Sequence, residues 1–145
     1  MQITIEANDH GVSRLLTRIQ NRTKSAKPAM SIIGSIVRAS VVRNFEKEGR
    51  PQKWRRHSKK TIALRGVGAK ILRDQGFAGG LLGSINYKAF NDRVIIGTNK
   101  NYAATHQFGD EKKRIPARPF LMVQDEDWPE IRAALNEYIM KGAAK

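Results

Sequence analysis

The spacing of apolar residues changes along the chain, and this change restricts the fold more than any other feature of the sequence. Between residues 28 and 46 apolar residues recur every three or four positions, which is the period of an amphipathic helix. They are Met30, Ile33, Val37, Val41 and Phe45. From residue 85 the period becomes two, with Ile85, Tyr87 and Ala89 alternating before the turn-forming stretch FNDR. The apolar run 94–96 follows this turn, which is typical of a β-hairpin. We therefore expect an α+β fold in which a small antiparallel or mixed sheet with a β-hairpin is flanked by the long N-terminal helix and by a C-terminal helix.

Weaker patterns predict the elements of the first half. Ile3 and Ile5 alternate as in an edge strand, and the segment from Asp9 to Ile19 has the spacing of an amphipathic helix. Residues 51–70 have no clear period. We interpret them as a long loop with at most one helical turn, at Thr61 to Leu64, and loops of this length usually carry a function or become ordered by a partner.

The second half contains two further helix signals with an extended segment between them. The stretch YAATHQFG predicts a short helix that stops at Gly109. The two prolines of RIPARPFLMV favour extended backbone, and we expect a strand there. Asp127 is the expected N-cap of the last helix, with Glu130 three residues later.

The size and composition suit one domain, which we place at residues 1–145. The chain has no cysteine, which excludes disulfides, thiolate chemistry and cysteine zinc sites. The first ten residues lack the pattern of an export signal, and no apolar run approaches the ~20 residues of a membrane span. We expect a soluble chain that is not exported and has no membrane partner.

The formal net charge of +14 lies almost entirely in the first half of the chain. Residues 1–73 hold 17 Lys and Arg against 4 Asp and Glu, whereas residues 74–145 hold 10 against 9. Such an imbalance indicates a polyanionic partner, which is either a nucleic acid or an acidic protein surface. The cations gather in the basic loop at about residues 50–70, and the alternative is that they only solvate the surface. The candidates for partner binding in this loop are Arg50, Lys53, Trp54, Arg55, Arg56, Lys59 and Lys60.

No arrangement of residues predicts an enzyme, a metal site or a cofactor. The three histidines, His10, His57 and His106, lack metal-ligand spacing, and RGVGAKILR lacks the phosphate-loop pattern. Asp74 has no second carboxylate to share a proton, and Ser84 has neither the nucleophile-elbow pattern nor a marked base. We expect no catalytic residues, no metal and no cofactor.

Four stretches together resemble a known family. They are Trp54 followed by Thr61, ILRDQGFAGGLLGSI at residues 71–85, VIIGTNKNYAATHQFG at residues 94–109, and IPARPFL at residues 115–121. Their order and spacing are similar to those of the phage virion morphogenesis proteins, also called tail completion or head-tail joining proteins. The similarity covers about residues 50–145.

This resemblance implies a non-enzymatic α+β subunit, akin to tail terminators and connectors. It would complete the tail or join head and tail, be assembled in the bacterial host cytoplasm, and lie in the neck or tail of the virion. Its implied partners are other copies of itself, in a ring that the family suggests is hexameric, and neck, connector or tail proteins.

The stretch from Tyr102 to Leu121 could supply part of the binding surface. Its candidates are His106, Gln107, Arg118 and Phe120, of which Arg118 offers a forked donor and Phe120 an anchor. The alternative is that the aromatic residues, including Tyr102 and Phe108, fill the core, and that His106 and Gln107 form buried hydrogen bonds.

A second function remains open from the sequence. The basic half could track DNA, with Trp54 as a stacking surface among the cations, although no nucleic-acid-binding motif organises it. DNA is therefore a secondary partner candidate.

Overall fold

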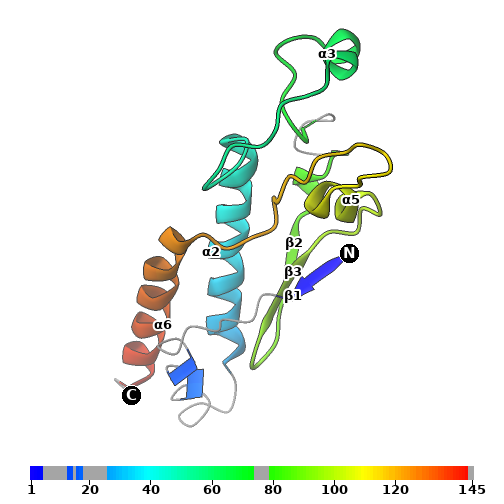
Figure 1. The fold of residues 1–145 in the computed structure, drawn as a ribbon. Helices are drawn as coiled ribbons and strands as arrows, with labels where there is room; N and C mark the ends of the chain where they lie inside the picture. Colours follow the sequence, from blue (N-terminus) through cyan, green and yellow to red (C-terminus); the bar gives the residue numbers. More distant parts are fainter. Residues whose placement is uncertain (5–12, 15, 18–25, 74–78, 144–145) are drawn as a thin grey trace. The chain divides into compact units, whose positions relative to one another are not determined.

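The chain folds into two compact units, each assembled from separated segments (Figure 1). The computed structural model describes residues 1–4, 13–14, 16–17, 26–73 and 79–143. One unit contains Met1 with residues 41–85 and 97–122, and is called the groove unit below. The other contains residues 2–40, 86–96 and 123–145, and is called the sheet unit. The assignment of a single domain to residues 1–145 stays a prediction.

The sheet unit contains the predicted hairpin. Strands β2 (Asn86–Ala89) and β3 (Val94–Gly97) are consecutive, and Phe90 N donates to Arg93 O across their turn at 2.8 Å. Strand β1 (Gln2–Thr4) lies on the other side of β3, so the order is β1-β3-β2. The edge strand predicted around Ile3 is confirmed, while Ile5 lies outside the described residues.

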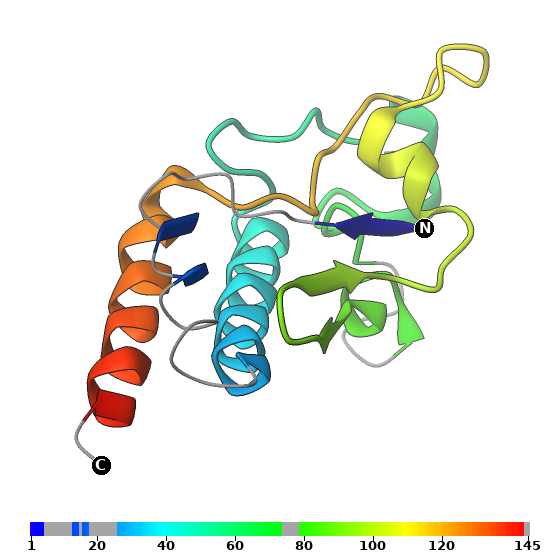
Figure 2. The same cartoon turned by 90° about the horizontal axis from the view of Figure 1, so that it is seen from below.

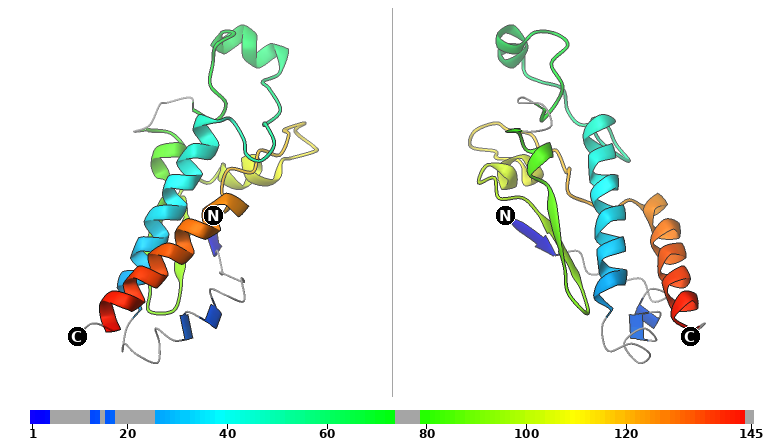
Figure 3. Two further views of the ribbon diagram at one scale, coloured as in Figure 1. Left: turned by 90° about the vertical axis from the view of Figure 1, so that its left-hand side faces the viewer. Right: turned by 180° about the vertical axis from the view of Figure 1, so that it is seen from behind.

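Helix α2 (Lys27–Glu46) begins in the sheet unit, where it lies between the hairpin and helix α6 (Trp128–Ala143) (Figures 2 and 3). Gly34 allows the close approach on the hairpin side, because a Cβ there would lie 2.3 Å from the Tyr87 ring. On the other side Ile131 and Leu135 of α6 are buried, and Ser40 of α2 donates a hydrogen bond to Asp127. The α+β class, with a long N-terminal helix, an antiparallel hairpin and a C-terminal helix packed on α2, is confirmed.

The C-terminal helix is preceded by a turn that the sequence did not predict. This 3-10 turn is η2 (Asp125–Asp127), and its N-cap is Gln124. Helix α6 begins directly after Asp127, the expected N-cap. The buried Asp127 carboxylate accepts hydrogen bonds from Gln124 N at 2.8 Å and from the Ser40 hydroxyl.

The groove unit contains the end of α2, helices α3 (Lys59–Arg65) and α5 (Ala103–Phe108), and the 3-10 turn η1 (Leu82–Ser84). Its core centres on three buried rings. Phe45 meets Trp54 edge to face at a centroid distance of 5.6 Å, and meets Phe120 at 5.4 Å. The indole Nε1 of Trp54 donates to Pro119 O at 3.1 Å. This core joins segments that are far apart in the chain.

The helical turn predicted at Thr61 to Leu64 is confirmed and is longer than expected, since it forms the seven-residue α3. Two other predictions about this unit were wrong. The expected strand at residues 114–123 is absent from the described sheet, and Ile115 forms only an isolated bridge with Asp110. Tyr102 and Phe108 are 42% and 68% exposed, so they do not fill the core.

The structure describes only part of the helix predicted from Asp9. In the predicted helix from Asp9, residues 13, 14, 16 and 17 are helical, and the other positions lie outside the described residues. Among the described residues, no helix combines the length and apolar character needed to cross a membrane.

Candidate functional site

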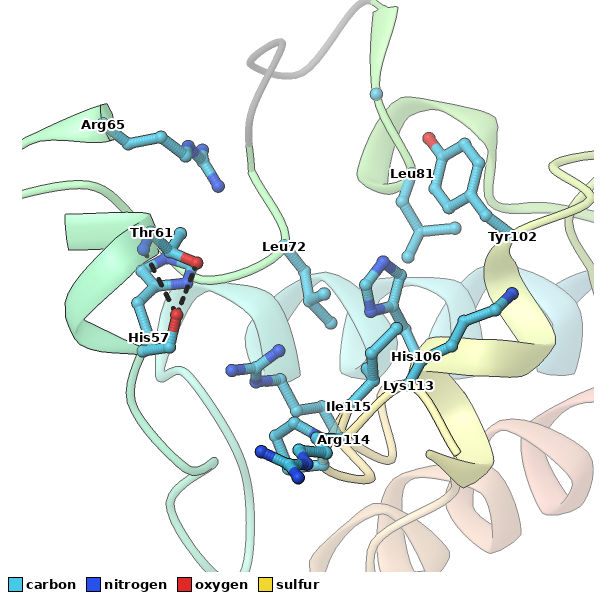
Figure 4. Close-up of a pocket in the computed structure, with 14 residues that line it drawn as sticks. His57, Thr61, Arg65, Leu72, Leu81, Tyr102, His106, Lys113, Arg114 and Ile115 are labelled. Carbon is cyan, nitrogen blue, oxygen red and sulfur yellow. Dashed lines mark hydrogen bonds between the residues drawn. The ribbon is translucent and has the colours of Figure 1, made fainter. Parts of the chain in front are cut away.

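The groove unit contains an open groove of about 560 Å³ (Figure 4). Its lining comes from residues 57–65 at α3, from Leu72, Gly80 and Leu81, from Tyr102 and His106 at α5, and from residues 113–118. Most of the lining residues are either basic or apolar. They are His57, Ser58, Thr61, Arg65, Leu72, Gly80, Leu81, Tyr102, His106, Lys113, Arg114, Ile115, Pro116 and Arg118.

Helix α3 has capping hydrogen bonds at both ends but no buried side chain. The Ser58 hydroxyl caps its N-terminus by accepting from Thr61 N at 3.2 Å, and Gly66 ends it with φ 88°. None of its residues is buried, and Leu64 and the following Val67 are 78% and 90% exposed. A seven-residue helix gains little stability from its own hydrogen bonds. Its exposed apolar side chains are therefore a surface suited to a protein partner.

Arg118 connects two walls of the groove. Its backbone N donates to His106 O at 2.7 Å, and its side chain donates to Arg55 O at 3.0 Å and Arg56 O at 3.3 Å. The predicted partner-binding arginine is thus 7% exposed and also orders the basic loop. Its burial, followed by the nearby charge of Arg55, lowers the pKa of the Arg118 guanidinium.

Gln107 and His106 lie side by side in the chain but differ in their contacts. The Gln107 Oε1 accepts from Phe120 N and Leu121 N, both at 3.0 Å, and its Nε2 donates to Leu121 O at 3.2 Å. The His106 ring packs edge to face on Tyr102. Its buried Nδ1 is the one such side-chain atom in the described residues that has no hydrogen-bond partner. His106 therefore retains hydrogen-bonding capacity, whereas Gln107 uses its capacity to hold residues 120–121.

The electrostatics of the groove favour an anionic ligand. Arg65, Lys113, Arg114 and Arg118 line it, and no carboxylate is among its described lining residues. Lys113 meets Asp110 at 3.7 Å near the surface. Burial, and then the charge of Arg118, lower the pKa of His106 below its usual 6.5. A bound anion would reduce both penalties, because it pairs with the cations and accepts hydrogen bonds from them.

The lowered pKa of His106 predicts a pH-dependent stability. Unfolding restores the usual pKa, so the unfolded chain binds the His106 proton more strongly than the folded chain. The stabilising contribution is complete above pH 6.5 and is lost as the pH falls through the lower folded pKa. We expect the free energy of unfolding to fall as the pH is lowered in this window, and His106→Gln to flatten the decrease. Urea unfolding at several pH values measures it, and an NMR titration midpoint of His106 at or above 6.5 would contradict it.

The sequence-predicted site residues are dispersed in the structure. Arg50 donates to Asn44 Oδ1 at 2.9 Å, Lys53 donates to Lys47 O, and Trp54 is 6% exposed. Phe120 is buried against Phe45. The four cations Arg55, Arg56, Lys59 and Lys60 are exposed but do not line the groove. Of the predicted candidates, the groove brings together only His106 and Arg118.

Other lining residues were missed by reasoning from the sequence. Tyr102 was expected in the core, His57 was considered only for a metal, and Lys113 and Arg114 were not among the candidates for partner binding. One sequence feature could have indicated Lys113 and Arg114. They belong to the run KKR, which stands directly before IPAR and therefore within a few residues of Arg118. The described residues contain no group of three or more His, Asp and Glu placed to hold a metal ion.

Comparison with known proteins assigns the chain to a family. The model of the phage virion morphogenesis family matches residues 7–140. The chain belongs to the phage virion morphogenesis family. The predicted resemblance is confirmed, and it extends to the N-terminal part that the motifs alone did not cover.

Two relatives of this phage virion morphogenesis protein come from Haemophilus influenzae. "Mu-like prophage FluMu G protein 2" is 33% identical over 142 residues, which cover 94% of this chain and 95% of the relative. "Mu-like prophage FluMu G protein 1" is 31% identical over 109 residues, which cover 72% and 73% respectively. No solved structure matches the chain. The full-length similarity to G protein 2 also supports the predicted link to prophages.

Proposed function

We propose that this phage virion morphogenesis protein acts by binding, without catalysis, to complete the tail or to join head and tail. The observation that carries the proposal is the family match over residues 7–140. The exposed apolar residues Leu64, Val67, Tyr102 and Phe108 support it, because they provide contact area for neighbouring subunits. The partners we propose are further copies of the chain in a ring, which the family resemblance suggests is a hexamer, and proteins of the neck, connector or tail.

Electron microscopy of particles made without the protein tests this function. The gene is interrupted by a stop codon in an inducible prophage and is supplied from a plasmid as the control. Separate filled heads and finished tails would indicate joining, whereas tails of irregular length would indicate completion. Normal, infectious particles without the protein would contradict both roles.

A count of the protein in purified virions tests whether it acts as a structural component. A subunit of a ring is expected in a fixed number of copies per particle, because each position must be filled. Quantitative mass spectrometry against a tail-tube protein measures this number. Particles that contain none of the protein, although its gene is needed for their assembly, would contradict a place in the neck or tail.

A further inference from the structure

We propose that the groove between α3, α5 and residues 113–118 binds a protein segment in which carboxylates neighbour an apolar side chain. The inference rests on the proposed assembly function and names the chemistry of one partner. That partner is a segment of another virion protein, and not the DNA or a second copy of this chain.

The charge of the groove is positive. The Arg114 guanidinium has no hydrogen bond or ion pair within the described residues, and φ of 54° at this residue places it in a tight turn. Lys113 beside it is exposed, and its Nζ lies 3.7 Å from the Asp110 carboxylate. Both cations enter the groove's lining together with Arg118, so a carboxylate there gains charge-assisted hydrogen bonds.

The His106 ring lines the groove and has an unpaired nitrogen. Its Nδ1 is shielded from solvent and has no hydrogen-bond partner within the described residues, which is costly. A rotation of the ring that brings this nitrogen to a ligand in the groove would remove the cost. The groups that face this ring are Tyr102 from its own helix and Arg118, whose backbone N bonds to His106 O. The neighbouring lining groups that titrate or carry charge are His57, Arg65, Lys113 and Arg114. All of these charges have the sign that attracts a carboxylate.

The apolar side chains of the groove favour a protein ligand over nucleic acid. Leu72, Leu81, Tyr102 and Ile115 line the same groove (Figure 4), so the cations stand beside an apolar wall. Leu64 of α3 and Phe108 of α5 are exposed, as is Val67. Trp54, the expected stacking surface for bases, is buried instead. The aliphatic side chains of Leu72, Leu81 and Ile115 add contact area for an apolar side chain and offer nothing to a phosphate backbone.

The binding test uses the full chain and defined probes. The probe is a fluorescein-labelled dodecapeptide that alternates Glu with Leu and Phe, and its matched control carries Gln for each Glu. The binding variant is Lys113→Glu with Arg114→Glu. The control variant is Lys88→Glu with Lys112→Glu, which has the same net charge but changes exposed residues outside the groove. Circular dichroism and thermal unfolding verify that both variants fold.

We expect the acidic peptide to bind at least tenfold more tightly than its Gln control. The groove variant should weaken this binding by tenfold or more, and the control variant by less than threefold. Tyr102→Ser should also weaken it, which a purely ionic attraction would not require. Equal binding by the groove variant and the control variant would overturn the proposal.

Two competing probes decide the occupant. A duplex DNA that displaces the peptide and loses tenfold affinity in the groove variant would overturn the protein ligand in favour of nucleic acid. A peptide copying residues 123–137 of this chain, which contain exposed Asp125 and Glu130, would overturn another virion protein in favour of a second copy if it bound tenfold more tightly than the probe.

Particle assembly separates this inference from the proposed function. If the stop-codon strain makes no complete particles and the groove variant restores them fully, the groove inference fails and the assembly function stands. If particles form normally without the protein, the assembly function fails, whatever the peptide binding shows.

Discussion

Replacing Phe45 by alanine is expected to lower the free energy of unfolding by about 3–5 kcal/mol. Phe45 is fully buried and its ring contacts both Trp54 and Phe120, so the truncation removes the centre of the groove unit's core. The loss combines the transfer of the ring from water with the cavity that remains. Urea unfolding followed by circular dichroism measures it, and Phe45→Leu should cost less because it leaves a smaller cavity.

The matched control is Phe108→Ala. This phenylalanine is 68% exposed at the end of α5, so the same truncation should change the free energy of unfolding by less than about 0.5 kcal/mol. Similar losses for the two variants would mean that Phe108 is buried in the folded protein. The arrangement of the core described above would then be incorrect.

Replacing Gln107 by leucine is expected to lower the free energy of unfolding by about 2–4 kcal/mol. The side chain of Gln107 serves three backbone groups, Phe120 N, Leu121 N and Leu121 O, in a buried position. Leucine has a similar volume but leaves all three groups without partners, and unsatisfied buried polar groups are costly. The segment after Pro119 should also loosen, which amide hydrogen exchange at residues 120–121 would report.

The control for this variant is Gln52→Leu. Gln52 is exposed in the basic loop, so the same substitution should alter stability by no more than about 0.5 kcal/mol. If Gln107→Leu kept wild-type stability and wild-type exchange at residues 120–121, the three hydrogen bonds would not be what holds this segment.

The elements with a strong local period were predictable. Helix α2, the β2–β3 hairpin and the short helix that stops at Gly109 all appear close to their expected bounds. In each, neighbours within four residues determine the period, and a turn or glycine marks the end. The strand expected at residues 114–123 failed for the converse reason. Prolines favour extended backbone, but a strand also requires a pairing partner, and residues 120–121 find theirs in the side chain of Gln107.

The candidate site was predictable only in part. His106 and Arg118 were selected from one short stretch, and they do lie at the groove. The candidates of the basic loop do not lie at the groove. Trp54 is buried, and the exposed cations of this loop do not line the groove. Composition identifies an excess of positive charge, but it does not say which cations converge.

The sequence by itself determined the α+β class, the principal helices and the hairpin, and it contained motifs specific enough to indicate the family. Only the tertiary structure decided which aromatic residues face inward and which cations share a groove. The physical reason is the separation of the contacts along the chain. Trp54 is buried because Pro119, 65 positions away, accepts its hydrogen bond, and Phe108 is exposed because no segment covers it among the described residues. The spacing of apolar residues along a short segment does not indicate contacts between residues that lie far apart in the chain.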